Sequence, residues 1–315
     1  MSLDPQVEEL LGFIGQHLPE LGSVPIDRFR TINSNLISAQ PPGPDLHEVK
    51  DLVLSGPGGA VGLRLYVPQP SLPAGVILYF HGGGWAVGDV DGHDAPLRLL
   101  AQATDLPVVS VDYRLAPEHP FPAAVEDAYA TLEWVNQNLA SWFGMAVPLI
   151  VAGDSAGGNL AAAISIMARD LNGPEITAQV LLYPSVAGRE FINSPELKNY
   201  ETPFLSLKDI EWFIEQYVPD VEARLDPRFA PLFAPSLENL PPALVLTAQY
   251  DLLTAEAEAY SQTLRKAGNI SEVHRYDGTV HGFFSLAPNQ RQAMRAREDI
   301  KAFVHGVLRG CRINS

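Results

Sequence analysis

Cysteine is almost absent from this chain of 315 residues, in which only Cys311 occurs, close to the C-terminal end. A single thiol can form no disulfide within the chain and no cysteine-based metal site, so both are excluded. Basic residues are also scarce, because 21 Lys and Arg face 37 Asp and Glu and leave a formal net charge of −16. Such a charge repels phosphate backbones and anionic lipid surfaces, so nucleic acid is not an expected partner.

Long hydrophobic runs are missing as well, since no apolar run approaches the ~18 residues that a membrane span needs. The opening segment "MSLDPQVEELLGFIGQHLPE" carries acidic residues where a secretory signal needs positive charge, and its apolar residues recur at helical spacing. We therefore expect an N-terminal amphipathic helix, no membrane span and a cytoplasmic location. A homodimer is left open.

The chain does contain enough apolar sequence, 46% of 315 residues, to bury the core of one large α/β domain with insertions. Apolar strands alternate with helical segments, which is the pattern of a mostly parallel sheet covered on both faces. The first two strands flank the turn "GPGGA" and should pair antiparallel. The eight predicted strands lie at about 46–56, 61–68, 75–80, 107–113, 148–153, 179–184, 242–251 and 271–278.

Two segments do not fit this alternation. The proline-rich "AQPPGPD" at 39–45 ends an opening helical segment, which we take as residues 1–45. From about Val186 to Pro231 there is no strand pattern, but there are prolines and the aromatic-rich "KDIEWFIEQYV". Long connections in compact domains usually carry function, so we expect an inserted helical cap at 186–231 within the main domain at 46–315.

One serine stands at a corner made of small residues. The segment "GDSAG" at 153–157 fits the pattern G-x-S-x-G, between an apolar strand and a helix that starts at "AGGNL". Such a strand-to-helix turn exposes the serine at its tip, and the helix N-terminus that follows supplies free N–H groups. The pattern alone also fits a plain tight turn, so a second motif has to decide. We take Ser155 as the candidate nucleophile.

The second motif is "HGGGW" at 81–85, directly after the strand "VILYF". This position, after the third strand, is where α/β-hydrolases place the second half of an oxyanion hole. Glycines allow the backbone N–H groups of Gly83 and Gly84 to turn toward a substrate, and the N–H of Ala156 is the third candidate donor. His81 is expected to brace the loop.

A serine nucleophile needs a histidine base and a carboxylate that orients it, and in α/β-hydrolases they follow the serine in the order acid, then histidine. Of the three histidines after Ser155, we choose His281, because the loop "DGTVHGFF" follows the last strand. His274, within a strand, and His305, in the last helix, fit a structural role. Asp251 stands at the carboxyl end of a strand, where open α/β sheets build their sites. We expect it to be the acid, on one of three successive strand ends, and its competitor Asp277 to shape a turn.

Four motifs, "HGGGW", "DYRLAPEHPFPAA" (112–124), "GDSAGGN" and "HGF", resemble those of the hormone-sensitive-lipase-like carboxylesterases, the bacterial family IV esterases. The resemblance spans about residues 75–285. It implies an α/β-hydrolase core, a cap made of N-terminal helices and an insertion, and hydrolysis of short to medium acyl esters. The chain departs from the family in "DLLTAE" at 251–256, where many members have D-P-L-R-D-E, so the bracing of that loop is expected to differ.

Together these features predict a serine carboxylesterase in which Ser155 attacks the ester, His281 moves the proton and Asp251 holds the imidazole. A small-molecule ester is the expected partner, and no metal or organic cofactor is needed. Two alternatives stay open at this point. One is another hydrolase, acting on amides, lactones or carbamates. The other is a non-catalytic binder, as in relatives that have lost the histidine, and His281 argues against it.

Four further polar residues have structural predictions. We expect structural roles for the side chains of Arg114, Glu118 and His119, and a role for Asp154 in tuning the site or, preferably, in bracing the corner. Both segments outside the sheet pattern carry apolar residues that need a surface to cover, and that surface should lie above Ser155. They include Leu10, Phe13, Phe29, Phe204, Trp212 and Phe213.

Overall fold

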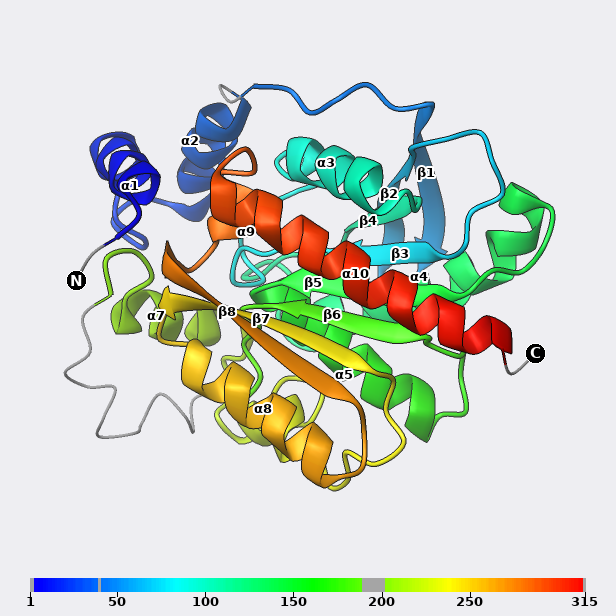
Figure 1. The fold of residues 1–315 in the computed structure, drawn as a ribbon. Helices are drawn as coiled ribbons and strands as arrows, with labels where there is room; N and C mark the ends of the chain where they lie inside the picture. The colour runs from blue at the N-terminus through cyan, green and yellow to red at the C-terminus, as the bar shows by residue number, and fades with distance from the viewer. Residues whose placement is uncertain (1–2, 39–40, 189–201, 314–315) are drawn as a thin grey trace.

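The computed structural model describes residues 3–38, 41–188 and 202–313. Its centre is an eight-stranded sheet in the order β1-β2-β4-β3-β5-β6-β7-β8 (Figure 1). The strand β2 pairs antiparallel with β1 and with β4, and all other neighbours are parallel. The strands are β1 (Glu48–Gly56), β2 (Gly59–Val67), β3 (Val76–Phe80), β4 (Val108–Asp112), β5 (Leu149–Asp154), β6 (Ala178–Leu182), β7 (Ala243–Tyr250) and β8 (Ser271–Val280).

The central strands β3, β5 and β6 are buried along their whole length because both faces of the sheet are covered. In β3 every residue is buried, and successive side chains enter two different cores: Leu78 packs on one face, and Ile77 and Tyr79 pack on the other. The first core is closed by α4 (Ala123–Phe143), α5 (Ala156–Asp170) and α8 (Thr254–Lys266), and the second by α3 (Asp94–Thr104) and α10 (Arg291–Ile313). Figure 1 shows these two helical layers on either side of the sheet.

A third group of helices gathers at the carboxyl ends of the parallel strands. These are α1 (Pro5–His17), α2 (Ile26–Ser38), α7 (Leu207–Tyr217) and the short α9 (Phe283–Leu286) (Figure 1). Two short 3-10 helices, η1 (Glu222–Leu225) and η2 (Pro231–Phe233), follow α7 before the chain re-enters the sheet. Because α/β sheets build their sites at this edge, these helices lie where they can cover one.

The predicted fold class is confirmed: the protein has an α/β-hydrolase fold with a mostly parallel eight-stranded sheet, opened by an antiparallel pair. Of the predicted insertion at 186–231, residues 189–201 lie outside the described residues, as do residues 39 and 40 of the proline-rich break. Within the described ranges, no helix is both long enough and apolar enough to cross a membrane.

Candidate active site

Ser155 occupies a strained corner between β5 and α5. Its backbone angles, φ 54° and ψ −116°, lie outside the regions that side-chain-bearing residues favour, which is the geometry of a nucleophile elbow. The turn is so tight that a Cβ atom on Gly157 would overlap the carbonyl oxygen of Phe80 on the neighbouring strand. The motif therefore needs glycine at 157 because β3 and the start of α5 touch there.

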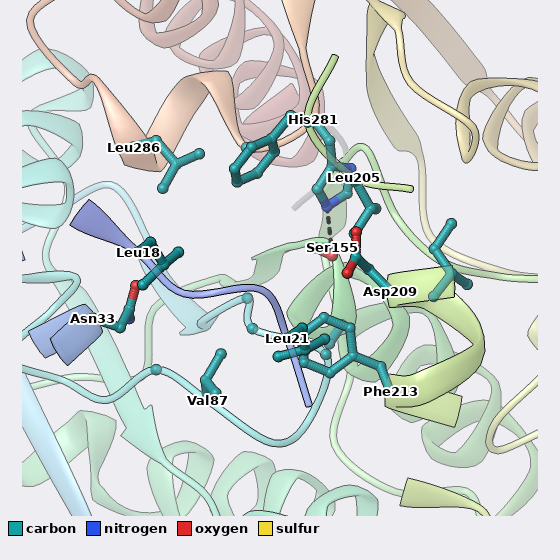
Figure 2. Close-up of a pocket in the computed structure, with 18 of the residues that line it drawn as sticks. Leu18, Leu21, Asn33, Val87, Ser155, Leu205, Asp209, Phe213, His281 and Leu286 are labelled. Carbon is teal, nitrogen blue, oxygen red and sulfur yellow. Dashed lines mark hydrogen bonds between the residues drawn. The ribbon is translucent and has the colours of Figure 1, made fainter. Parts of the chain in front are cut away.

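The structure brings the three residues of the predicted triad together. The Nε2 atom of His281 lies 2.8 Å from Oγ of Ser155, the interaction drawn as a dashed line in Figure 2. The Nδ1 atom of His281 lies 2.7 Å from Oδ2 of Asp251, and the Asp251 side chain is fully buried. With its hydrogen on Nδ1, the imidazole donates to Asp251 and accepts from the Ser155 hydroxyl.

The competing residues lie elsewhere. His274 pairs with Asp299, whose carboxylate is 3.2 Å from Nδ1, and His305 contacts the carbonyl oxygen of Thr104 at 2.7 Å. Asp277 is exposed and lies within β8, 3.7 Å from Arg275. None of these groups is among the residues that line the pocket around Ser155.

One expectation about placement was wrong, because the three residues do not stand on successive strand ends. Ser155 follows β5, Asp251 follows β7 and His281 follows β8, so that β6 lies between the serine and the acid. The triad closes across this gap because the His281 ring reaches back from the edge strand. The ring of Tyr183, just after β6, meets it edge-on with 4.9 Å between ring centroids.

The glycine loop after β3 faces Ser155 across the pocket. Gly83 and Gly84 have φ angles of 118° and 57°, and neither amide donates a backbone hydrogen bond within the described part of the chain. His81 is buried, its Nδ1 lies 2.8 Å from the carbonyl oxygen of Gly82, and its ring stacks on Tyr113. Burial, together with the nearby His93, lowers the pKa of His81 to about 4, so this imidazole is neutral at physiological pH.

A cavity of about 690 Å³ opens above Ser155 (Figure 2). Its walls are mostly apolar and come from the glycine loop, from the N-terminal helices and their connection, and from the segment around α7. Phe29, Phe204 and Phe213 line it, as expected. Leu10, Phe13 and Trp212 do not line it. Phe13 is 47% exposed and contacts only His17 among aromatic rings of the described residues.

Comparison with known proteins identifies the family. A family model for the alpha/beta hydrolase fold matches residues 77–285. The carboxylic ester hydrolase LipN of Mycobacterium tuberculosis is 43% identical over 254 residues, covering 78% of this chain and 67% of LipN. Esterase LipI of the same organism is 43% identical over 253 residues, covering 79% and 78%. The structure of a hyperthermophilic esterase from the archaeon Pyrobaculum calidifontis is similar with a TM-score of 0.86 and 38% identity, covering 96% of this chain and 97% of that one. The chain is a family IV carboxylesterase of the α/β-hydrolase superfamily.

The departure in the acid loop of this esterase has a local compensation. Oδ1 of Asp251 accepts a hydrogen bond from the backbone N–H of Leu253 at 3.0 Å, and the hydroxyl of Thr254 donates to the carbonyl oxygen of Ala248 at 2.6 Å. Glu256, which keeps the last acidic position of the motif, is buried and accepts from the N–H of Val186 at 2.7 Å. Burial raises the pKa of Glu256 to about 8. The loop is thus braced by its own backbone and by Glu256.

In the block at 112–124 of the esterase, Arg114 has a structural role, because its guanidinium binds both carboxylate oxygens of buried Asp127 at 2.8 Å. Glu118 connects this block to an N-terminal helix, because its carboxylate accepts two hydrogen bonds of 2.8 Å from Arg30 on α2. His119 lies on the surface and bonds through its backbone N–H to Leu115.

Four polar groups around the site escaped the sequence reading: Tyr79, His93, Glu256 and Ser285. Tyr79 lies two residues before "HGGGW" and Ser285 two residues after "HGF", and this proximity to the motifs is a usable signal. Glu256 is the last residue of the "DLLTAE" segment, which is also a usable signal, whereas no local pattern marks His93. Among the residues that the structure describes, no group of three or more His, Cys, Asp and Glu side chains could hold a metal ion.

Proposed function

We propose that this carboxylesterase hydrolyses esters of short to medium acyl length through an acyl-enzyme intermediate on Ser155. The observation that carries the proposal is the pair of hydrogen bonds that links Ser155, His281 and Asp251, at 2.8 and 2.7 Å, inside an apolar cavity. Nucleophile and base within hydrogen-bond reach, with the base oriented by a carboxylate, is the arrangement that activates a serine hydroxyl.

In the first half of the reaction, Oγ of Ser155 attacks the ester carbonyl carbon while Nε2 of His281 takes the hydroxyl proton. The amides of Gly83, Gly84 and Ala156 donate to the oxyanion that develops on the carbonyl oxygen. When the tetrahedral intermediate collapses, the carbon–oxygen bond to the alcohol breaks and His281 gives its proton to the departing oxygen. Asp251 stabilises the imidazolium in between.

In the second half, His281 takes a proton from a water molecule whose oxygen attacks the acyl carbon. The second tetrahedral intermediate collapses, the bond to Oγ of Ser155 breaks, and the proton returns to the serine. The carboxylic acid and the regenerated hydroxyl are the products, so no metal or organic cofactor enters the proposed balance.

The acyl preference is proposed from the cavity. Residues 1–45 and 186–231 are proposed to form its cap, because Leu18, Phe29, Phe204 and Phe213 line the space above Ser155. Each buried methylene contributes about 0.8 kcal/mol, so kcat/KM should climb with acyl length until the chain outgrows a cavity of about 690 Å³.

The test is an ester series from acetate to palmitate with one alcohol, run beside Ser155→Ala. A rise followed by a fall supports the proposal, and a profile that keeps rising to palmitate contradicts the acyl assignment. Phe213→Ala should move the optimum to longer chains, whereas Phe13→Ala, outside the cavity, is the matched control and should leave it in place.

A matched ester and amide pair separates an esterase from an amidase. The cytoplasmic location stays a prediction, which cell fractionation checks. Whether the protein forms a homodimer stays open, and light scattering would decide it.

A further inference from the structure

A buried carboxylate stands directly behind the candidate site. Asp154, the residue before Ser155, is fully enclosed at the end of β5. Its Oδ1 accepts from the backbone N–H of Gly82 and from the hydroxyl of Tyr79, both at 2.9 Å, and its Oδ2 accepts from Ser285 at 3.0 Å. The carboxylate therefore ties the corner of Ser155 to the glycine loop and to the segment that follows His281.

The negative charge of Asp154 opposes the negative charge that develops on the oxyanion in the proposed reaction. Gly82 is bonded to it and immediately precedes Gly83, one of the proposed oxyanion donors. A carboxylate near a developing oxyanion opposes the charge that the site has to stabilise, and water screens little of this repulsion in a buried site. The arrangement calls for a buried positive charge beside Asp154.

The side chain of His93 is in the right place to supply that charge. His93 precedes α3, is 8% exposed and lines the cavity, and its Nε2 lies 3.5 Å from Oδ1 of Asp154. Neither of its ring nitrogens has a hydrogen bond of ordinary geometry within the described ranges, and the acceptors that face the ring are the carboxylate of Asp154 and the backbone of Asp89. A neutral imidazole carries one N–H for these two acceptors, whereas an imidazolium carries two and is the charge partner of the carboxylate.

The titratable groups that face His93 come from three places: Asp154 at the end of β5, Asp89 in the loop before it, and His81 after β3, with 5.3 Å between the two imidazole rings. Burial lowers the pKa of His93, but Asp154 and Asp89 outweigh burial and raise it above the ordinary histidine value. Burial likewise raises the pKa of Asp154, but His93, Tyr79 and Ser285 bring it below the ordinary value. His81 stays neutral and adds no competing charge.

We propose that His93 is a positioning residue of this esterase: as an imidazolium paired with Asp154, it neutralises the carboxylate behind the oxyanion loop and so sustains the rate of the chemical step. The proposal rests on the proposed function of Gly83, Gly84 and Ala156. When His93 loses its proton at alkaline pH, the charge of Asp154 is left uncompensated. The value of kcat then falls, while KM changes little because the ground-state ester carries no oxyanion.

The first measurement does not depend on activity. Titration of the His93 ring by NMR in the whole protein, with His93→Gln for assignment, should give a pKa above the ordinary value of ~6.5, and Asp154→Asn should lower it. A His93 pKa at or below ~6.5 in the native protein, or one unmoved by Asp154→Asn, overturns the pairing. This result stands even if Ser155 proves not to be the nucleophile.

The second measurement is the pH profile of kcat. His93→Gln should lower kcat about tenfold at neutral pH and remove the alkaline limb, while KM stays within about twofold. The double variant Asp154→Asn/His93→Gln, which removes both charges, should recover most of the lost kcat. A merely structural role predicts additive losses instead, and that result contradicts the proposal.

Two controls separate other titrating groups. Glu256, with a pKa of about 8, could also give an alkaline limb. The alkaline fall of kcat should persist in Glu256→Gln. If it disappears in Glu256→Gln and persists in His93→Gln, the proposal is overturned. His274→Gln, on the surface beside Asp299, should leave the profile unchanged.

Discussion

The ring of Phe213 lies directly over the backbone of Gly84, so closely that a Cβ atom on Gly84 would overlap the ring. One residue away, the indole of Trp212 lies against Gly22 in the connection between α1 and α2, where a Cβ atom would lie 2.9 Å from its Nε1. The helix α7 is therefore in contact with the glycine loop through one aromatic ring and with the N-terminal helices through the next.

Gly84→Ala should lower kcat on the order of 100-fold, corresponding to about 3 kcal/mol of transition-state stabilisation, with a smaller effect on KM. The reasons are the overlap with Phe213 and the φ angle of 57°, which alanine resists. Steady-state kinetics on one ester measures the effects on kcat and KM separately. In the double variant Gly84→Ala/Phe213→Ala the clash is relieved, so part of the lost kcat should return. A Gly84→Ala variant that raises KM and leaves kcat unchanged would show that the Gly84 amide is not an oxyanion donor.

Ser155→Ala should reduce kcat by about 10⁴-fold or more while circular dichroism and the melting temperature stay close to those of the parent, since triad members act as a unit. A fluorophosphonate should label the parent protein on Ser155, and mass spectrometry locates the adduct. Recovery of the label on Ser285, which also lines the cavity, would show that Ser155 is not the nucleophile.

His281→Ala should be as inactive as the serine variant, because no other base lies within hydrogen-bond reach of Oγ of Ser155 among the described residues. The other two histidines that follow Ser155 in the sequence serve as controls: His274→Gln and His305→Gln should stay near the parental rate, since both rings bond away from the cavity. Retention of most activity in His281→Ala refutes the assignment of the base.

The buried Glu256 should make the protein less stable as pH rises. Its folded-state pKa of about 8 lies above the ordinary glutamate value of 4.5, so between these values the folded state holds a proton that the unfolded chain has released. The free energy of unfolding should therefore fall with pH across this window, by at most about 1.4 kcal/mol per pH unit from this group. Urea titrations at several pH values measure the slope, and Glu256→Gln should flatten it. An equal slope in that variant would exclude Glu256 as the source.

The N-terminal helices should depend on Arg30 for their attachment. Its guanidinium donates to both oxygens of Glu118 and to the carbonyl oxygens of Ala86 and Ala116, each at 2.8 Å, and so joins α2 to the end of the glycine loop and to the segment after β4. Arg30→Ala should cost about 1 to 3 kcal/mol of stability, and Arg30→Lys should recover only part of it because lysine lacks the planar fork.

The pair can be isolated by a double-mutant cycle with Glu118→Gln, for which we expect a coupling of roughly 1 kcal/mol, because the Glu118 side chain is 45% exposed. Arg28→Ala, on the exposed side of the same helix, is the matched control and should be nearly neutral. If the coupling is near zero and Arg28→Ala destabilises the protein as much as Arg30→Ala does, helix propensity and not the attachment explains the loss of stability in Arg30→Ala.

The sequence by itself determined the features that depend on short range. The alternation of apolar strands and helices follows from local periodicity, and the corner of Ser155 and the loop of Gly83 and Gly84 follow from motifs of five residues, because a tight turn needs small residues at adjacent positions. The order of acid and histidine after the serine then narrowed the choice to Asp251 and His281.

Only the tertiary structure decided what depends on contacts between distant parts of the chain. It placed β6 between Ser155 and Asp251, left Phe13 exposed, and set Phe213 over Gly84. It also enclosed His93 beside Asp154, although the two residues are 61 positions apart in the sequence. No local pattern encodes such a pair, because its two members are brought together by the packing of β5 and α3 around one core, and burial then makes their charges matter.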